Sequence, residues 1–299
     1  MFPNPIAPPI AASTKAGRED HSREGLMRLF ACHGHTIIYR DIKSDEINPA
    51  DAAGVDCVAI AGGDGTVGKV LRALIDVDRP FTILPLGTAN NMARSFKLPL
   101  GADDTVCCVD EATEKRFDVG IARGPWGSRL FFEAVGIGAL AEMMQTGNSA
   151  KLSPEDKQHF GDQAPQQFVQ DAPAQDWQVR VDGEELPGEM IFFETLNMPI
   201  TGPNLPLGPS GCFDNGLLSL AVLRPDGRDS FLSWLAGSRD RPSTGLERLT
   251  AKQVDLVWPR GALRIDDDLP KTPEEPRRVA IELAPQKLRL RVPKTNGDV

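Results

Sequence analysis

The chain has 299 residues, enough for one large domain or two ordinary ones, and its 40% apolar and 25% charged residues are typical of a globular protein. Its formal net charge of −9 argues against nucleic acid as a main partner, because no basic field would attract a phosphate backbone. The odd number of cysteines and the lack of a C-x-x-C pair argue against a disulfide framework or a structural zinc site. With no signal-peptide pattern and no apolar stretch long enough to span a bilayer, these features predict a soluble, cytoplasmic protein.

The first half of the chain alternates between helical and strand patterns. After an expected loop at residues 1–17, we expect helices over 22–33, 66–75 and 88–96, and strands over 35–42, 56–61 and 81–86. The last two strands are short apolar runs, as expected of strands buried on both faces, and each is followed by a predicted helix. This order is typical of a parallel α/β sheet.

After about residue 116 the pattern changes to short alternating segments separated by turn residues. This half is expected to be β-rich, antiparallel and sandwich-like. Residues 146–176 are polar and are expected to form an excursion on the surface. Asp182-Gly183, within the tetrapeptide VDGE, lies between two alternating segments and is interpreted as a hairpin turn.

The stretch VAIAGGDGTVGKVLRALI, residues 58–75, resembles three different phosphate-binding loops. A dinucleotide-binding loop would need an acidic residue about twenty positions later, but that position falls in the apolar segment FTILPL. A Walker A loop would need Ser or Thr after Lys69, where the chain has Val70. Both alternatives are therefore disfavoured.

The third interpretation takes GGDGT as a loop built around its acid. Gly62, Gly63 and Gly65 let the backbone turn sharply and approach a ligand, and free N–H groups at the start of the following helix, near Thr66, favour a phosphate. Asp64 would then face a polyphosphate, which requires a cation between them, so it is predicted to act through magnesium. The alternative is that Asp64 only caps the start of a helix.

A second loop, LPLGTANN at residues 84–91, follows the next predicted strand. Its small polar residues are Gly87, Thr88, Asn90 and Asn91. Because the carboxyl ends of neighbouring parallel strands meet at one edge of a sheet, we expect both loops to hold the same nucleotide.

GGDGT followed by LPLGTANNMARSF resembles the diacylglycerol kinase catalytic domain family, which includes bacterial lipid kinases and sphingosine kinases and is distantly related to NAD kinases. Later segments, FDVGIARG, FFEAVGIGA, FDNGLLSLAVL and LRIDDDLP, look like the β-rich second domain of that family. The resemblance implies a nucleotide-binding α/β domain of the NAD kinase/diacylglycerol kinase type over residues 1–116. It also implies an acceptor-binding domain over 117–285 and a final strand, 286–293, that returns to the first domain.

By this resemblance, the chain would transfer the γ-phosphate of ATP, with Mg²⁺, to a hydroxyl of a diacylglycerol-like or sphingoid-like lipid alcohol. Asp64 and Asp268 would be the catalytic residues, and Asp64 and Asp214 would be the metal ligands. The nucleotide would be held by Gly62, Gly63, Gly65, Thr66, Gly87, Thr88, Asn90 and Asn91. A lipid acceptor implies transient contact with the inner membrane surface, and the oligomeric state, a homodimer included, is left open.

Several positions depart from the family pattern, among them Gly68-Lys69, which stands where Asn-Glu is usual, and the opening strand, which is not clear. Asn91 replaces an aspartate, Asp214-Asn215-Gly216 replaces Asp-Asp-Gly, and Asp266-Asp267-Asp268 replaces Asp-Gly-Glu. The last of these also fits a solvated acidic turn. These departures motivate a rival hypothesis, a non-catalytic paralogue that binds nucleotide or lipid, while phosphorylation of NAD is a third alternative.

Overall fold

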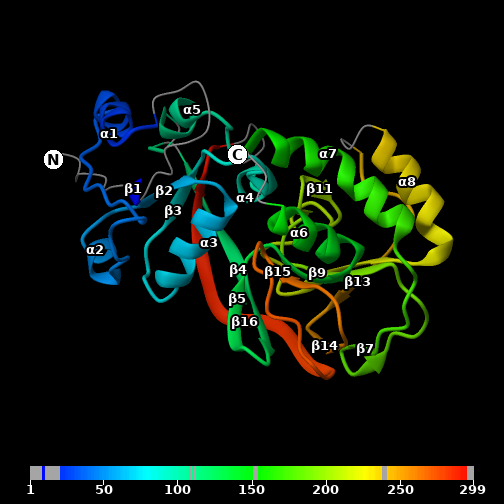
Figure 1. The fold of residues 1–299 in the computed structure, drawn as a ribbon. Coiled ribbons are helices and arrows are strands. Elements are labelled where there is room, and N and C mark those ends of the chain that lie inside the picture. Colours follow the sequence, from blue (N-terminus) through cyan, green and yellow to red (C-terminus); the bar gives the residue numbers. More distant parts are fainter. Residues whose placement is uncertain are drawn as a thin grey trace. The chain divides into compact units, whose positions relative to one another are not determined.

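The computed structural model describes residues 9–10, 21–107, 109–110, 112–150, 154–237 and 241–294 (Figure 1). The chain divides into two compact units. Unit 1 comprises Met1–Phe117 and Gln286–Val299, and unit 2 comprises Asp118–Pro285. Within the described ranges, no helix combines the length and the apolar character needed to cross a membrane.

Unit 1 contains a parallel sheet with strand order β1, β2, β3 and the second half of β16. Its elements are β1 (Pro9–Ile10), α1 (Arg23–Cys32), α2 (Pro49–Ala53), β2 (Val58–Gly62), α3 (Asp64–Ala73), β3 (Phe81–Pro85), α4 (Asn91–Ser95), α5 (Ala102–Cys107), the start of β4 (Thr113–Gly124) and the end of β16 (Arg277–Val292). All residues of β2 and β3 are buried, as their apolar sequences require. The predicted α/β fold with a parallel sheet is confirmed.

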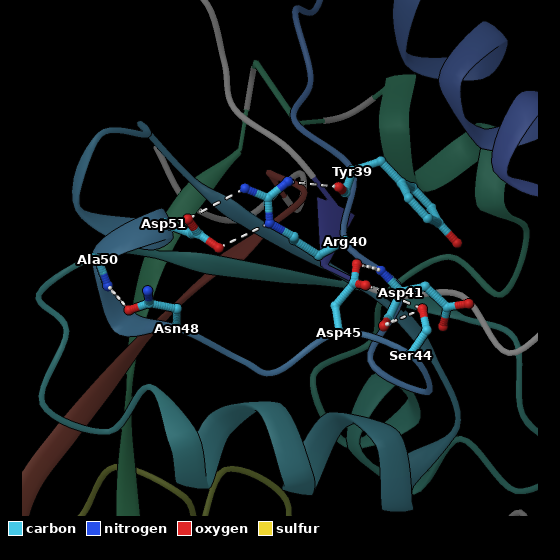
Figure 2. A network of polar contacts seen from close by, with 8 residues as sticks. All are labelled: Tyr39, Arg40, Asp41, Ser44, Asp45, Asn48, Ala50 and Asp51. Carbon is cyan, nitrogen blue, oxygen red and sulfur yellow. Dashed lines mark hydrogen bonds and ion pairs between the residues drawn. The ribbon is translucent and has the colours of Figure 1, made fainter.

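The prediction of a strand over residues 35–42 is wrong. That segment contains only an isolated bridge residue, Arg40, whose Nε and Nη2 donate to the Asp51 carboxylate at 2.9 and 3.3 Å (Figure 2). The hydrogen bond from Arg40 also holds the pKa of Asp51 below its ordinary value. Asp45 then accepts from the Asp41 N–H and closes a turn, so local bonds replace a ladder. The place beside β2 is taken by β1, within the expected loop 1–17, whose other residues lie outside the described ranges.

Unit 2 contains a five-stranded antiparallel sheet with strand order β13, β12, β9, β6, β15. A second antiparallel set is formed by β8, β7, β14 and the first half of β16. The elements after β4 are β5 (Gly127–Phe131), β6 (Ala134–Gly138), α6 (Ala139–Ser149), α7 (Pro154–Asp171), β7 (Val179–Val181), β8 (Glu184–Glu185), β9 (Phe192–Leu196), β10 (Ile200–Thr201), β11 (Leu205–Pro206), β12 (Leu218–Leu223), the 3₁₀ turn η1 (Pro225–Gly227), α8 (Arg228–Ala236), β13 (Leu246–Ala251), β14 (Gln253–Trp258) and β15 (Leu263–Ile265).

The core of unit 2 lies between these two sets of strands. Phe193 and Leu220 from the five-stranded sheet pack in one buried cluster with Leu256, Trp258 and Ile281 from the other set. A second buried cluster joins the five-stranded sheet to its helices, and includes Phe192 and Phe231. The predicted β-rich, sandwich-like second half is therefore confirmed.

The polar stretch 146–176, expected as a surface excursion, contains α7, an 18-residue helix that contacts α6 and α8. Asp182 and Gly183 do form the hairpin turn between β7 and β8, both with positive φ, at 50° and 90°. The Asp182 Oδ1 also accepts from the N–H groups of Lys252 and Gln253, each at 2.9 Å.

A buried ion pair crosses three strands of the five-stranded sheet. Arg264 on β15, Gly136 on β6 and Glu194 on β9 lie in one row, and two guanidinium nitrogens donate to the Glu194 carboxylate at 3.1 and 2.8 Å. A Cβ on Gly136 would lie 2.1 Å from Glu194 Oε2, so glycine is required beneath the pair. Burial raises the pKa of Glu194, although Arg264 opposes the shift. The pair is stable because each charge has the other as its partner.

Replacing Glu194 by Gln should therefore leave the buried Arg264 without its hydrogen-bonded countercharge and lower the free energy of unfolding by about 3–5 kcal/mol. Chemical denaturation monitored by circular dichroism would measure the loss. A double variant, Glu194→Met with Arg264→Met, should recover most of it because neither charge of the pair remains buried. A single variant as stable as the original chain would contradict this account.

The cysteines differ in how far they are exposed to solvent. Among the described residues Cys32 and Cys107 are exposed, whereas Cys57 and Cys212 are buried. Burial raises the pKa of Cys57 to about 12 and that of Cys212 to about 11. The reactive thiolate is therefore almost absent at both buried positions near neutral pH.

Alkylation at pH 8 should thus modify Cys32 and Cys107 in the folded protein while sparing Cys57 and Cys212. Peptide mapping by mass spectrometry would measure the extent at each position, and alkylation in denaturant provides the fully modified control. Rapid labelling of Cys57 under native conditions would mean that the β2 strand opens locally.

Candidate functional site

Two loops follow neighbouring parallel strands of unit 1. The register of β2 with β3 pairs Val58 with Phe81 and ends at Gly62 and Pro85, so both strands end at the same edge of the sheet. The first loop leads into α3 and the second into α4. The loops identified in the sequence are therefore brought together by the fold.

The first loop is shaped by glycines and by the start of α3. Gly63 is the N-cap in an extended conformation without a side-chain cap, and the helix begins at Asp64, two residues earlier than predicted. A Cβ on Gly62 would lie 2.4 Å from the Thr66 Cγ2, so the threonine packs directly on the end of the strand. The first N–H groups of a helix have no partner within it and favour an anion, and here they come from Asp64, Gly65 and Thr66.

The two loops touch through glycine. A Cβ on Gly87 would lie 2.4 Å from the Gly63 Cα and 2.8 Å from the Asn90 Oδ1, which no side chain can tolerate. The Leu86 N–H donates to the Gly62 carbonyl at 3.2 Å. The backbones of the loops thus lie against each other at one edge of the sheet, and we call this set of backbone groups the cradle: Gly63–Thr66 and Leu86–Asn90.

Asn90 holds the second loop in shape. Its Oδ1 accepts from the Gly87 N–H at 2.9 Å, and its Nδ2 donates to the carbonyls of Pro85 and Gly87 at 3.3 and 2.8 Å. Its φ of 53° lies in the left-handed region, which asparagine tolerates better than most residues. The Asn90 side chain therefore acts within the loop, whereas Thr88 is exposed and Asn91 is buried.

Asp64 connects the two loops. Its Oδ2 accepts from the Asn91 N–H and its Oδ1 from the Met92 N–H, each at 3.0 Å. The carboxylate predicted to work through magnesium thus lies in the first turn of α3 and caps the start of α4. Asp64 therefore caps α4 rather than its own helix, α3.

Lys69 does not lie in a phosphate-binding loop. It is in the second turn of α3, and its Nζ donates to the Ile42 carbonyl at 3.1 Å, beside the 41–45 turn shown in Figure 2. This contact supports the choice of GGDGT over the Walker A pattern.

The residues expected to bind metal do not form a metal site by themselves. Asp214 is exposed in a turn, and Asp118 is the buried acid nearby, accepting from the Gly216 N–H at 2.9 Å. The described part of the chain contains no group of three or more His, Cys, Asp or Glu side chains arranged to hold an ion. Carboxylate oxygens are the ligands that magnesium prefers, so Asp64, the one carboxylate of the cradle, is compatible with an ion that arrives with a nucleotide.

The acidic turn of unit 2 is not uniformly solvated. Asp266 is buried and left-handed, with φ of 51°, and its Oδ1 accepts from the N–H groups of Phe132, Glu133 and Ala134 at 3.0, 2.8 and 3.3 Å. Asp268 is exposed, and its Oδ2 lies 3.6 Å from Arg129 Nη1. Sequence reasoning missed the structural role of Asp266, which fixes the turn that presents Asp268.

Comparisons with known proteins agree with this geometry. The family model named "Diacylglycerol kinase catalytic domain" matches residues 22–122, which include both loops of the cradle. The predicted resemblance to the diacylglycerol kinase catalytic domain family is confirmed.

Curated relatives carry kinase names. A "Probable lipid kinase YegS-like" of Yersinia enterocolitica is 28% identical over 191 residues, 59% of this chain and 60% of the relative. A "Diacylglycerol kinase" of Mycobacterium tuberculosis is 28% identical over 188 residues, 61% of this chain and 60% of the relative. The chain thus spans about 60% of the length of these two relatives.

Solved structures show the same fold. A crystal structure of a diacylglycerol kinase from Bacillus anthracis str. Sterne superposes with a TM-score of 0.67 at 16% identity, covering 99% of this chain and 98% of that one. Another structure from the same organism gives a TM-score of 0.71 at 18% identity. The diacylglycerol kinase fold therefore extends beyond the matched residues to the second half of the chain.

Asn90 offers a test of the cradle. Asn90→Ala should lower the free energy of unfolding by about 2–4 kcal/mol, because it removes the hydrogen bonds inside the loop and places alanine in a left-handed conformation. Asn90→Gly loses the same bonds without the backbone strain. It should therefore lower the free energy of unfolding by roughly 1 kcal/mol less than Asn90→Ala does. Thermal or chemical unfolding would measure both, and equal costs would show that the left-handed backbone does not matter there.

Proposed function

We propose that this protein is an ATP-dependent lipid kinase that transfers the γ-phosphate of ATP to the hydroxyl of a diacylglycerol-like or sphingoid-like lipid. The observation that carries the proposal is the cradle, in which two glycine loops touch at the edge of a parallel sheet beside the N-terminus of α3. Its position within residues 22–122 supports a kinase rather than an unrelated phosphate-binding protein.

In this proposal the cradle holds the polyphosphate. Backbone N–H groups of Gly65 and Thr66 at the start of α3 point toward the phosphates and stabilise their charge, which the helix dipole also favours. The Thr88 hydroxyl, exposed on the second loop, donates from the other side. Magnesium bound to the nucleotide would neutralise phosphate charge, with Asp64 as its protein partner.

Transfer requires little covalent chemistry from the protein. The lipid hydroxyl oxygen forms a bond to the γ-phosphorus while the bond from that phosphorus to the bridging oxygen of ADP breaks. The hydroxyl proton passes to a carboxylate, for which we propose Asp268, held in place by the buried Asp266. Because the acceptor is a lipid, the reaction also requires transient contact with a membrane surface.

A second candidate function is nucleotide binding without transfer. Two observations favour it: the Asp268 carboxylate lies near Arg129, and position 91 has an amide in place of an acid. Both candidates require ATP to bind to the cradle, and they differ only in whether phosphate reaches a lipid.

The deciding experiment incubates the purified full chain with γ-labelled ATP, Mg²⁺ and mixed micelles that contain diacylglycerol or a sphingoid base, followed by organic extraction. We expect label in the lipid phase. ATP binding without labelled lipid would favour the non-catalytic alternative, and label on added NAD would instead identify an NAD kinase.

Asp268→Asn should lower the rate of lipid phosphorylation by about 100-fold or more, because the amide cannot accept the proton. ATP affinity should change little, since Asp268 is not part of the cradle. Asp267→Asn is the matched control, because Asp267 is the adjacent exposed acid of the same turn. Equal losses in both variants would assign the effect to the charge of the turn rather than to Asp268.

A further inference from the structure

The start of α4 is capped from another helix. Asn90, the N-cap residue of α4, makes no side-chain bond to its own helix because its amide is bonded to Pro85 and Gly87. The N–H groups of Asn91 and Met92 instead donate to the two carboxylate oxygens of Asp64, each at 3.0 Å. A residue in the first turn of α3 thus does what a local cap usually does.

From this contact we infer that Asp64 is a positioning residue that holds the second loop against the first, and that this role does not require magnesium. We call the two bonds from Asn91 and Met92 to Asp64 the clasp. The inference rests on the proposed function, because it concerns how the cradle binds nucleotide.

The clasp needs a carboxylate. Two N–H groups approach two different oxygens, and an ionised aspartate has an acceptor on each. Asparagine has nearly the same shape but offers one oxygen and one NH₂ group, which would oppose the second N–H. The partial positive charge at the start of α4 also favours an anion there. Asp64→Asn therefore breaks one of the two bonds of the clasp with a minimal change in volume.

The clasp stabilises a close contact between the two loops. Gly63 and Gly87 approach so closely that no Cβ fits between them, and one backbone bond, from Leu86 to Gly62, also joins the loops. If α4 moves away, Thr88 moves with its loop and leaves the N-terminus of α3. The affinity for the polyphosphate should then fall.

A role through magnesium alone predicts the opposite result when the metal is removed. Without the cation, the negative charge of Asp64 repels the phosphates. Asp64→Asn would then bind metal-free nucleotide as well as the original chain, or better. The clasp predicts weaker binding in both conditions, so the sign of the effect in EDTA distinguishes the two roles.

The experiment measures ADP affinity of the full chain by calorimetry, once with Mg²⁺ and once with EDTA. Asp64→Asn should weaken binding by about tenfold or more in both conditions, the equivalent of one charge-assisted hydrogen bond. The matched control is Asp182→Asn in unit 2, which also accepts from two consecutive N–H groups, at 2.9 Å each, and should leave ADP affinity unchanged. Unchanged or tighter binding of Asp64→Asn in EDTA would overturn the inference.

Amide hydrogen exchange tests the clasp without reference to nucleotide. In Asp64→Asn the amides of Asn91 and Met92 should exchange about tenfold faster, while those of β2 remain protected and show that the variant is folded. If the original chain binds no ADP but these amides respond, the proposed function fails and the clasp stands. If ADP binds and the amides do not respond, the clasp fails and the proposed function stands.

A variant on the second loop covers the case in which Asp64→Asn does not fold. Asn90→Gly loosens the second loop while Asp64 is retained, so it should also weaken ADP binding in EDTA. Unchanged affinity in that variant would show that the position of the second loop does not control binding and would overturn the inference.

Discussion

Backbone N–H groups at the ends of strands and helices need an acceptor, and in this chain carboxylates from distant segments supply it. Asp64 accepts from α4, Asp182 from the start of β14, and Asp266 from the corner before β6. A buried N–H without a partner costs about 1–3 kcal/mol, so the buried bonds of Asp266 fix one segment firmly relative to another. The part-buried bonds of Asp64 act in the same way, whereas the exposed bonds of Asp182 contribute less. Part of the acidic excess of this chain is therefore structural and does not simply repel polyanions.

This constraint explains how a loop site can be rigid. Loops are mobile by default, and ordering them on binding would reduce affinity. In the cradle the ordering has already occurred, through the amide of Asn90, the contact between Gly63 and Gly87, and the carboxylate of Asp64. Donors fixed before the ligand arrives need no reorganisation, which is the condition under which they stabilise charge most effectively.

The sequence predicted those features whose cause is local. The strands β2 and β3 were found because continuous apolar runs require burial on both faces, and both loops were found because glycine and small polar residues follow those strands directly. The strand expected over residues 35–42 does not form; Arg40 instead donates to Asp51, 11 positions later, and Asp45 accepts from the Asp41 N–H. The helix α7 was missed because it contains Pro165 and polar residues, and it is stabilised by contacts with α6 and α8.

The partners of the acidic residues could not be predicted in this way. Asp64 and the N–H of Asn91 are 27 positions apart, and Asp266 and the N–H of Glu133 are 133 apart, so only the folded chain brings them together. A residue type indicates that an acceptor is available, but the register of the sheet decides which donor it meets. The glycines were informative because their requirement is steric, although the contact that requires Gly87 is with Gly63 of the other loop.

The clasp also gives a physical reason for the departure at position 91. It is the backbone N–H of residue 91 that meets Asp64, so the clasp forms with either asparagine or aspartate at that position. An aspartate would, however, add a second negative charge on a residue that touches Asp64, and two neighbouring carboxylates repel each other unless a cation lies between them. Asn91 removes that repulsion, so the loops can remain joined before any cation arrives. The substitution that weakens the case for a tightly held metal is thus the one that makes a preformed, metal-independent cradle stable.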